Sequence, residues 1–351
     1  MMRAASLLLV LLALLTPTRA ISQTVETNMM TGGPKGTYIQ IGRDIAALSR
    51  ECGRNLVVQE SAGSLENLIA VKKRTFTQFG IVQSDVLEYV STYAGSDPDL
   101  ARAILGVRSM FPLYNEEVHV LAKWDINSLG ELAGRKVAIG VTDSGTYLTA
   151  TLILDILQVQ GVEKVLAGSV DGLDMLKRGE IDAMFYVTGA PASLFSDPEI
   201  DGARFHLLPI TEKPLLATYN KAQIAGGVYP FQPEPVDVVT VKAVLMTFDY
   251  RKDKNDYHQG NCKAVADIAN IIVTNLDRLR ESGHPKWKNV DLSALPPGWR
   301  VGDCVKDGMR ADYQLSCQRD TGTLGAAPAP AAEVVDQEYL NLLKQRLGDG
   351  G

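Results

Sequence analysis

Two stretches of this chain, SLENLIAVKKRTFTQFGIV at residues 64–82 and SVDGLDMLKRGEIDAMFYV at residues 169–187, resemble each other along their length. Each begins with a serine and a helical pattern, becomes basic at the end of that helix, and continues after a turn into an apolar strand. Basic residues favour a helix C-terminus because the helix dipole is negative there. The second copy begins 105 positions after the first, and the repetition predicts two similar halves. Chance is the alternative explanation, because short helix–strand units often look alike.

A second repetition lies upstream of each copy. Gly36-Thr37-Tyr38 recurs as Gly145-Thr146-Tyr147, each time after an apolar strand, near residues 25–30 and 136–140. Each half therefore reads as strand, glycine-rich loop, helix, strand, helix, strand, an alternation that predicts parallel sheets covered on both faces. Such sheets bind ligands outside the carboxyl ends of their strands. We expect at least four helix N-termini to face one cleft, where backbone N–H groups suit an anion such as a carboxylate.

Length and composition exclude several classes of protein. The chain has 351 residues, enough for two or three domains, and its 46% hydrophobic and 22% charged content excludes wholesale disorder. The formal net charge is −6, from 35 basic and 41 acidic residues. This balance argues against a nucleic-acid partner, which normally requires a basic patch or stripe.

The N-terminus reads as a cleaved secretory signal. Arg3 precedes an apolar run over residues 4–15, and Thr18 and Ala20 occupy the −3 and −1 positions of a plausible cleavage site. A buried N-terminal helix is the alternative. We expect the mature chain to begin near Ile21 and to be exported, with no later run as long as a membrane span.

Five motifs occur in the order found in one known family. They are TGGPKGTY at 31–38, GSLENL at 63–68, GIVQSD at 80–85, DSGT at 143–146, and GEIDAMFYV at 179–187 followed by Gly-Ala-Pro at 189–191. Together they resemble the TAXI family of periplasmic solute receptors, the extracytoplasmic subunits of one branch of tripartite ATP-independent periplasmic (TRAP) transporters. The resemblance covers residues 25 to 305. Pro34 and Lys35 depart from it, because they replace the small residues common inside the first loop.

The resemblance implies an α/β, two-lobed (Venus-flytrap) fold of type II periplasmic binding proteins, with two similar open sheets joined by hinge strands. The crossings are expected near residues 111–122 and 238–246, and C-terminal helices from about residue 261 return to the first lobe. The implied division is a signal peptide at 1–20, lobe 1 at 21–115 and 241–320, lobe 2 at 116–240, and a flexible tail at 321–351.

The implied function is a periplasmic receptor that delivers a small carboxylate or amino acid, glutamate-like or a dicarboxylate, to a TRAP membrane permease. The alternatives are an exported ligand-binding sensor component not coupled to transport, and a hydrolase. The sequence contains no G-x-S-x-G elbow, no G-x-G-x-x-G and no P-loop, so we do not expect an enzyme.

The candidate ligand-binding residues follow the expected strand ends: Gly32, Gly33, Gly36, Thr37, Tyr38, Gly63, Ser64, Asn67, Gln83, Ser84, Ser144, Gly145, Thr146 and Tyr186. A carboxylate contact is expected most strongly at residues 144–146. Each residue also has a structural interpretation. The glycines suit a tight turn, Tyr38 suits a core, and Thr37 and Ser64 suit helix N-caps. Asp85 is expected to cap the next helix rather than to bind the ligand.

Four cysteines in an oxidising compartment permit two disulfides in three connectivities. We expect Cys262 to pair with Cys304, because Cys262 starts a C-terminal helix and Cys304 follows a Pro-Pro-Gly-Trp turn where the chain doubles back. Cys304 with Cys317 is the alternative, and Cys52 is the hardest to place. The cysteines form no CxxC pair and the four histidines are scattered, so we expect no zinc site and no cofactor.

Overall fold

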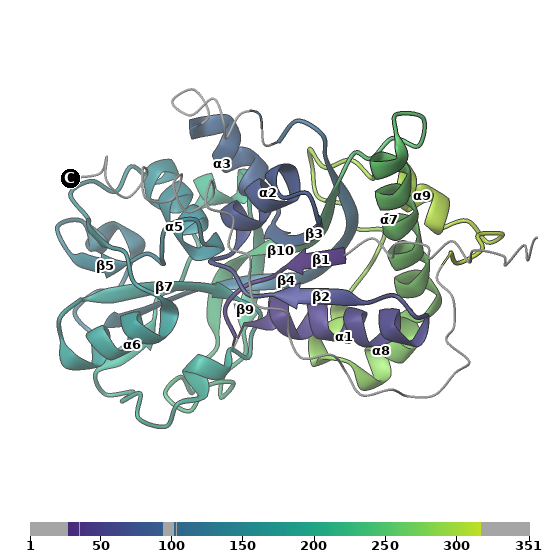
Figure 1. The fold of residues 1–351 in the computed structure, drawn as a ribbon. Helices are drawn as coiled ribbons and strands as arrows, with labels where there is room; N and C mark the ends of the chain where they lie inside the picture. The colour runs from purple at the N-terminus through teal and green to yellow at the C-terminus, as the bar shows by residue number, and fades with distance from the viewer. Residues whose placement is uncertain (1–26, 35, 94–101, 103, 317–351) are drawn as a thin grey trace, which may run out of the picture. The chain divides into compact units, whose positions relative to one another are not determined.

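A computed structural model describes residues 27–34, 36–93, 102 and 104–316 (Figure 1). All of these residues belong to one compact unit, residues 1–318. The predicted signal peptide, the tail at 321–351, Lys35 and Cys317 lie outside the described residues. No helix in the part of the chain that the structure describes is long and apolar enough to span a bilayer.

A ten-stranded mixed sheet forms the framework, in the order β2-β1-β3-β10-β4-β7-β5-β6, with β8 paired to β4 and β9 to β10. The strands are β1 Thr27–Met30, β2 Leu56–Gln59, β3 Thr77–Gln83, β4 Val107–Lys123, β5 Lys136–Ala138, β6 Glu163–Val165, β7 Ala183–Thr188, β8 Phe205–Leu207, β9 Asn220–Ile224 and β10 Val236–Phe248. Strands β1, β2 and β3 pair in parallel, as do β5, β6 and β7.

The helices alternate with the strands as the repetition predicts. They are α1 Thr37–Glu51, α2 Ser64–Lys73, α3 Val86–Tyr93, α5 Gly145–Ile156, α6 Ser169–Arg178, α7 Asp256–Thr274, α8 Leu276–Ser282 and α9 Asp303–Gly308, with short 3₁₀ turns η1 Leu129–Leu132, η2 Ser193–Ser196, η3 Lys213–Ala217 and η4 Pro285–Asn289. The chain runs β1-α1-β2-α2-β3 and later β5-α5-β6-α6-β7. The predicted α/β class, with two similar halves, is confirmed.

Two long strands, β4 and β10, cross between the halves. β4 pairs antiparallel with β10 over its first part and with β7 and β8 over its second. The two sheets expected from the sequence are therefore two halves of one continuous sheet, because β10 and β4 pair with each other and with strands of both halves. The expected crossing segments 111–122 and 238–246 are the central parts of these two strands.

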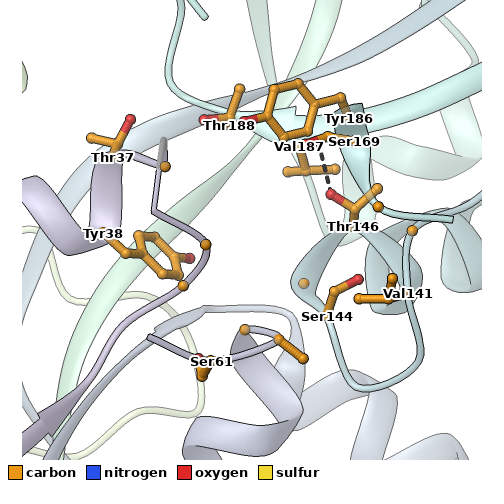
Figure 2. Close-up of a pocket in the computed structure, with 18 of the residues that line it drawn as sticks. Thr37, Tyr38, Ser61, Val141, Ser144, Thr146, Ser169, Tyr186, Val187 and Thr188 are labelled. Carbon is orange, nitrogen blue, oxygen red and sulfur yellow. Dashed lines mark hydrogen bonds between the residues drawn. The ribbon is translucent and has the colours of Figure 1, made fainter. Parts of the chain in front are cut away.

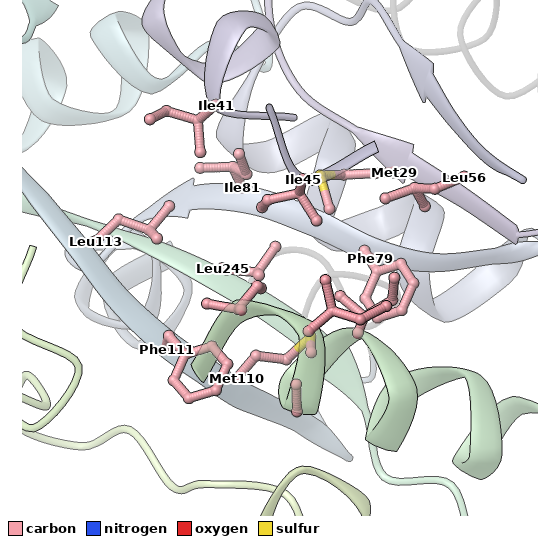
Figure 3. Packing of buried hydrophobic residues seen from close by; sticks show 14 of the residues in the cluster. Met29, Ile41, Ile45, Leu56, Phe79, Ile81, Met110, Phe111, Leu113 and Leu245 are labelled. Carbon is pink, nitrogen blue, oxygen red and sulfur yellow. The ribbon is translucent and has the colours of Figure 1, made fainter. Parts of the chain in front are cut away.

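Apolar residues cover both faces of the first half of the sheet. Along β3, Phe79 and Ile81 pack with α1, α7 and α8, whereas Val82 packs with α2 and α3. This alternation follows from the two-residue period of a strand. Figure 1 shows α1 and α8 on one side of these strands and α2 and α3 on the other, and Figure 3 shows Ile41 and Ile45 of α1 packed near Ile81. Helices on both faces leave the ends of the strands as the place for a site.

The C-terminal helices begin earlier than expected. Helix α7 starts at Asp256 because Asn255 is its N-cap. The Asn255 side chain accepts a hydrogen bond of 2.9 Å from the backbone N–H of His258.

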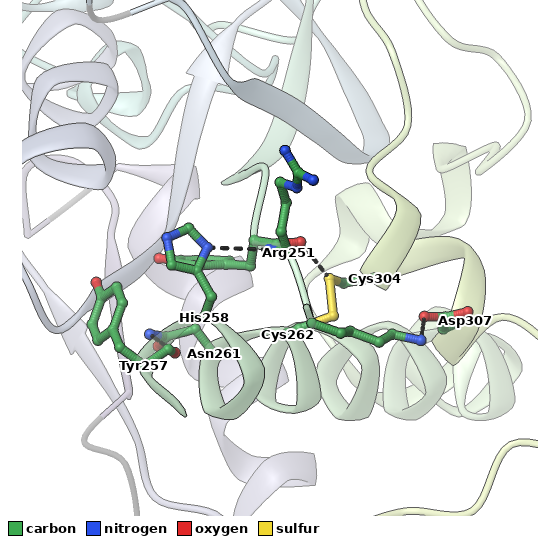
Figure 4. The surroundings of a disulfide bond; sticks show 9 residues. Arg251, Tyr257, His258, Asn261, Cys262, Cys304 and Asp307 are labelled. Atoms are coloured by element: carbon green, nitrogen blue, oxygen red, sulfur yellow. Dashed lines mark hydrogen bonds and ion pairs between the residues drawn. A yellow bond between two sulfur atoms is a disulfide. The ribbon is translucent and has the colours of Figure 1, made fainter. Parts of the chain in front are cut away.

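A disulfide joins Cys262 in α7 to Cys304 in α9, the pairing that the sequence favours (Figure 4). Cys52 is also disulfide-bonded.

Replacing both Cys262 and Cys304 with serine is expected to lower the free energy of unfolding by roughly 3–4 kcal/mol. The bridge closes a loop with a sequence separation of 42, so its loss frees the unfolded chain. Urea unfolding at neutral pH measures the difference. A loss of less than about 1 kcal/mol relative to the oxidised parent protein would contradict the prediction.

Candidate ligand-binding site

A cavity of about 370 Å³ lies at the carboxyl ends of the strands. The N-termini of four helices border it: α1 through residues 36–38, α2 through Ala62 and Gly63, α5 through residues 144–146, and α6 through residues 168–171. Figure 2 shows Thr37 and Tyr38 across the cavity from Ser144 and Thr146, with Tyr186 and Thr188 on a third side. The volume accommodates a molecule the size of an amino acid or a small organic acid.

Most of the candidate residues line this cavity. They are Gly32, Gly33, Gly36, Thr37, Tyr38, Gly63, Gln83, Ser144, Gly145, Thr146 and Tyr186. Three candidates, Ser64, Asn67 and Ser84, are not among the lining residues. Contact of any of these residues with a ligand remains a prediction.

Asn67 and Ser84 hold the backbone around the cavity. The buried Asn67 side chain donates to the carbonyl oxygens of Thr31 and Ile81, at 2.6 and 2.7 Å. It thereby ties the first glycine-rich loop to β3. The Ser84 hydroxyl accepts a hydrogen bond from the backbone N–H of Lys242 at 3.2 Å and so fixes the end of β3 on β10.

The alternative interpretation of Thr37 and Ser64 as helix N-caps is wrong by one position. Gly36 and Gly63 are the N-caps of α1 and α2, and Thr37 and Ser64 are the first helical residues. The Ser64 hydroxyl instead accepts a hydrogen bond of 3.0 Å from the backbone N–H of Gln83. Glycine caps leave the helix N–H groups without a side-chain oxygen, which keeps the end of α1 open to an anion. At α2 the backbone carbonyl oxygen of Asp143 accepts the N–H groups of Leu65 and Glu66 instead.

In the second half, serine is the cap. The Ser144 hydroxyl accepts from the backbone N–H of Tyr147 at 3.0 Å, and the Thr146 hydroxyl accepts from Val187 N–H at 3.1 Å. Both hydroxyl protons can still be donated, since each oxygen uses only a lone pair in these contacts. Ser144 and Thr146 are thus fixed by the backbone and directed at the cavity.

The helix ends of the two halves touch each other beside the cavity. Leu65 N–H of α2 donates to Asp143 O at 3.0 Å. Gly63 has a φ of +131°, and a Cβ there would lie 3.0 Å from the backbone nitrogen of Gly145. Glycine at both positions is required by this close approach, because side chains would separate α2 from α5.

Asp85 does not cap α3 through its side chain, contrary to expectation. Its Oδ2 accepts hydrogen bonds from Thr149 of α5 at 2.8 Å and from the Tyr219 hydroxyl at 3.0 Å. Oδ1 is buried and has no hydrogen-bond partner among the described residues. Burial raises the pKa of Asp85 to about 6. Asp85 therefore links the end of β3 to the second half of the sheet.

Sequence reasoning missed Glu116, a buried carboxyl group of β4 that lines the cavity. Its Oε2 accepts a hydrogen bond of 2.6 Å from the Tyr38 hydroxyl. Desolvation raises the pKa of Glu116 to about 8, an effect that the Tyr38 hydrogen bond opposes. The available signal was the polar sequence Asn115-Glu116-Glu117 in the middle of a mostly apolar, mostly buried strand, where a charged side chain is costly to bury.

No lysine, arginine or histidine is present among the described residues that line the cavity. The nearby Lys286 of η4 pairs with Glu117 at 3.3 Å. The histidines make structural hydrogen bonds; His119, for example, contacts the Tyr229 hydroxyl at 2.7 Å. Within residues 27–34, 36–93, 102 and 104–316, no group of three or more His, Cys, Asp or Glu could hold a metal ion.

The strand order and the two crossing strands define a type II periplasmic-binding-protein fold, with the cavity where that architecture places a ligand. The chain belongs to the NMT1-like family, whose model matches residues 29–293.

Solved structures with similar folds are distant in sequence. The periplasmic binding protein BugD is 12% identical, with 76% of this chain and 88% of that chain covered and a TM-score of 0.45. The substrate-binding protein of an amino acid ABC transporter is 13% identical, with 75% and 95% covered and a TM-score of 0.42. A putative sulfonate-binding protein, SsuA from Methylobacillus flagellatus KT, is 11% identical, with 73% and 69% covered and a TM-score of 0.44.

Proposed function

We propose that this protein is a periplasmic solute receptor that binds a small carboxylate or amino acid and delivers it to a TRAP-type permease. One observation carries the binding part: four helix N-termini border one cavity whose described lining contains no cationic side chain. Backbone N–H groups and helix dipoles then supply the positive potential for a carboxylate. The permease partner rests on the resemblance to TAXI receptors.

The ligand would act by joining the two halves of the sheet. Donors at α1 come from the first half, and donors at α5 and α6 come from the second. A ligand that contacts both sets binds a closed arrangement more tightly than an open one, and this differential affinity drives closure. A permease would recognise the closed form.

The hydroxyl groups that line the cavity support ligand binding and not catalysis. Among the described residues, the Ser144 and Thr146 hydroxyl groups accept backbone N–H groups and donate to no basic side chain, whereas an activated nucleophile requires a base on its proton. We therefore infer that the protein is not an enzyme.

A thermal-shift screen of the exported protein against amino acids and organic acids tests the proposal. A specific ligand at one hundred times its Kd adds about 2.7 kcal/mol to the free energy of unfolding, which raises the melting temperature. Calorimetric titration then gives the affinity. Absence of a shift with every amino acid and carboxylate would overturn the proposed function.

Replacing Ser144 with alanine together with Thr146 with valine is expected to weaken ligand binding by about 2–3 kcal/mol, through the loss of two charge-assisted hydrogen bonds. The double variant also loses the α5 cap and the partner of Val187 N–H, so its free energy of unfolding falls by about 1–3 kcal/mol. Titration calorimetry well below the melting temperature separates the two effects.

Thr146→Ser is the control, because it keeps the hydroxyl group that contacts Val187. We expect this variant to bind within about threefold of the parent protein. Unchanged affinity in the double variant would move the carboxylate site away from α5.

A further inference from the structure

The cavity contains a carboxyl group that an anion receptor does not need. We propose that Glu116, positioned by Tyr38, binds the ammonium group of the ligand, so that the ligand is a zwitterionic amino acid whose carboxylate lies at the helix N-termini. This inference rests on the proposed function and specifies its substrate class. It assigns Glu116 as the residue that distinguishes amino acids from acids without an amino group.

The geometry leaves one oxygen of Glu116 for a ligand. Oε2 is engaged by the Tyr38 hydroxyl at 2.6 Å. Oε1 makes no hydrogen bond within the part of the chain that the structure describes, and Glu116 borders the cavity. An ionised carboxylate is acceptor-only, and an ammonium group is a compact donor of matching charge.

Among the residues that the structure describes, the charges around Glu116 leave it without a cation of its own. The titratable groups that influence it come from several elements: Tyr38 of α1, Asp85 after β3, Tyr114 and Glu117 of β4, Tyr186 of β7 and Lys286 of η4. Of these, Lys286 is the cation, and it is paired with Glu117. A buried carboxylate is costly unless it is paired, so a ligand cation completes this site.

A dicarboxylate would use the same cavity differently. Glu116 would then have to stay protonated and donate its proton to a second ligand carboxylate. That arrangement requires no charge on Glu116, and glutamine, which also donates, could replace it. Glu116→Gln, which keeps the shape of the side chain, therefore distinguishes the two arrangements. It should weaken the binding of an amino acid but not the binding of a dicarboxylate.

The experiment compares each amino acid with the acid that lacks its amino group. Titration calorimetry at neutral pH uses L-glutamate with glutarate, L-glutamine with glutaramate, and L-leucine with 4-methylpentanoate, on the parent protein and on Glu116→Gln. We expect one amino acid to bind at least 100-fold more tightly than its partner acid. Glu116→Gln should weaken that amino acid at least 30-fold and change the partner acid by less than about threefold.

Glu180→Gln is the control for the loss of one negative charge, because Glu180 is on the surface and pairs with Arg178 outside the cavity. It should bind the amino acid within about twofold of the parent protein.

Repeating the titrations in buffers of different ionisation enthalpy gives a second readout, the number of protons released on binding. Since burial keeps Glu116 protonated in the empty cavity at neutral pH, the parent should release close to one proton per amino acid bound, and Glu116→Gln should release none.

The outcomes separate the inference from the proposed function. If glutarate or another carboxylate binds the parent as tightly as its amino acid, or if Glu116→Gln binds both equally well, the protein is still a receptor and the ammonium site is wrong. Binding without proton release would also overturn the ammonium site. If no compound in the panel or in the wider screen binds, both proposals fall.

Discussion

The free energy of unfolding of the ligand-free protein is expected to rise by about 2 kcal/mol as the pH falls from about 8.5 to about 6.5. The cause is Glu116, whose pKa is raised from 4.5 to about 8 by burial. Above pH 8 Glu116 is ionised in both states, and the folded protein bears the cost of burying the charge. As the pH falls through 8, only the folded state takes up the proton, so the native state gains stability.

Glu116→Gln removes this pH dependence. At high pH the amide avoids the buried charge, and the variant should be more stable than the parent protein by up to about 5 kcal/mol. Urea unfolding across this pH range measures both proteins. A parent protein with flat stability, or a variant with the same slope, would show that Glu116 does not cause a pH dependence of stability in this range.

The pH window is chosen to isolate Glu116. Burial lowers the pKa of His119 from 6.5 to about 4, so that histidine changes stability only below about pH 6.5. Asp85, whose pKa is raised to about 6, contributes in the same direction as Glu116 but at lower pH. The slope above pH 6.5 therefore belongs to Glu116.

Replacing Asp267 with alanine is expected to cost about 3–5 kcal/mol of the free energy of unfolding. The fully buried Asp267 carboxylate pairs with Arg54 at 2.5 Å and accepts hydrogen bonds from the Tyr313 hydroxyl and from Ser316. Its removal leaves Arg54, which is mostly buried, without this counter-charge. Urea unfolding at neutral pH gives the difference.

Asp267→Asn is the matched control, because the amide keeps the shape and one acceptor oxygen. We expect it to lose less stability than Asp267→Ala and both variants to retain the ligand affinity of the parent, since Asp267 does not line the cavity. A loss below about 1 kcal/mol for Asp267→Ala would mean that solvent replaces the ion pair.

The sequence by itself determined the alternation of strands and helices and the places where the loops begin. Helical and strand periodicity are local properties, and the repeated 64–82 and 169–187 segments carry them in the order that the structure has. The glycine-rich loops follow the strands, so the arrangement of helix N-termini around a cavity was predictable from strand–loop–helix order.

The tertiary structure alone decided which side chains face the cavity and which hold the backbone. Asn67 and Gln83 both lie near expected strand or helix ends, yet Asn67 is buried against the carbonyls of Thr31 and Ile81, and Gln83 reaches the cavity. The N-caps of α1 and α2 are Gly36 and Gly63, each one residue before the Thr37 and Ser64 that the sequence suggested. Local patterns do not resolve differences of this size, because both residue types suit a helix start.

Glu116 and Asp85 depended most on the fold. Glu116 meets Tyr38, which is 78 positions away, and Asp85 meets Thr149 and Tyr219 of the other half of the sheet. The raised pKa values of both carboxyl groups arise from burial, which exists only when β3, β4, α1 and α5 are packed together. Desolvation and pairing between distant segments are properties of the assembled chain, so no local stretch of sequence contains them.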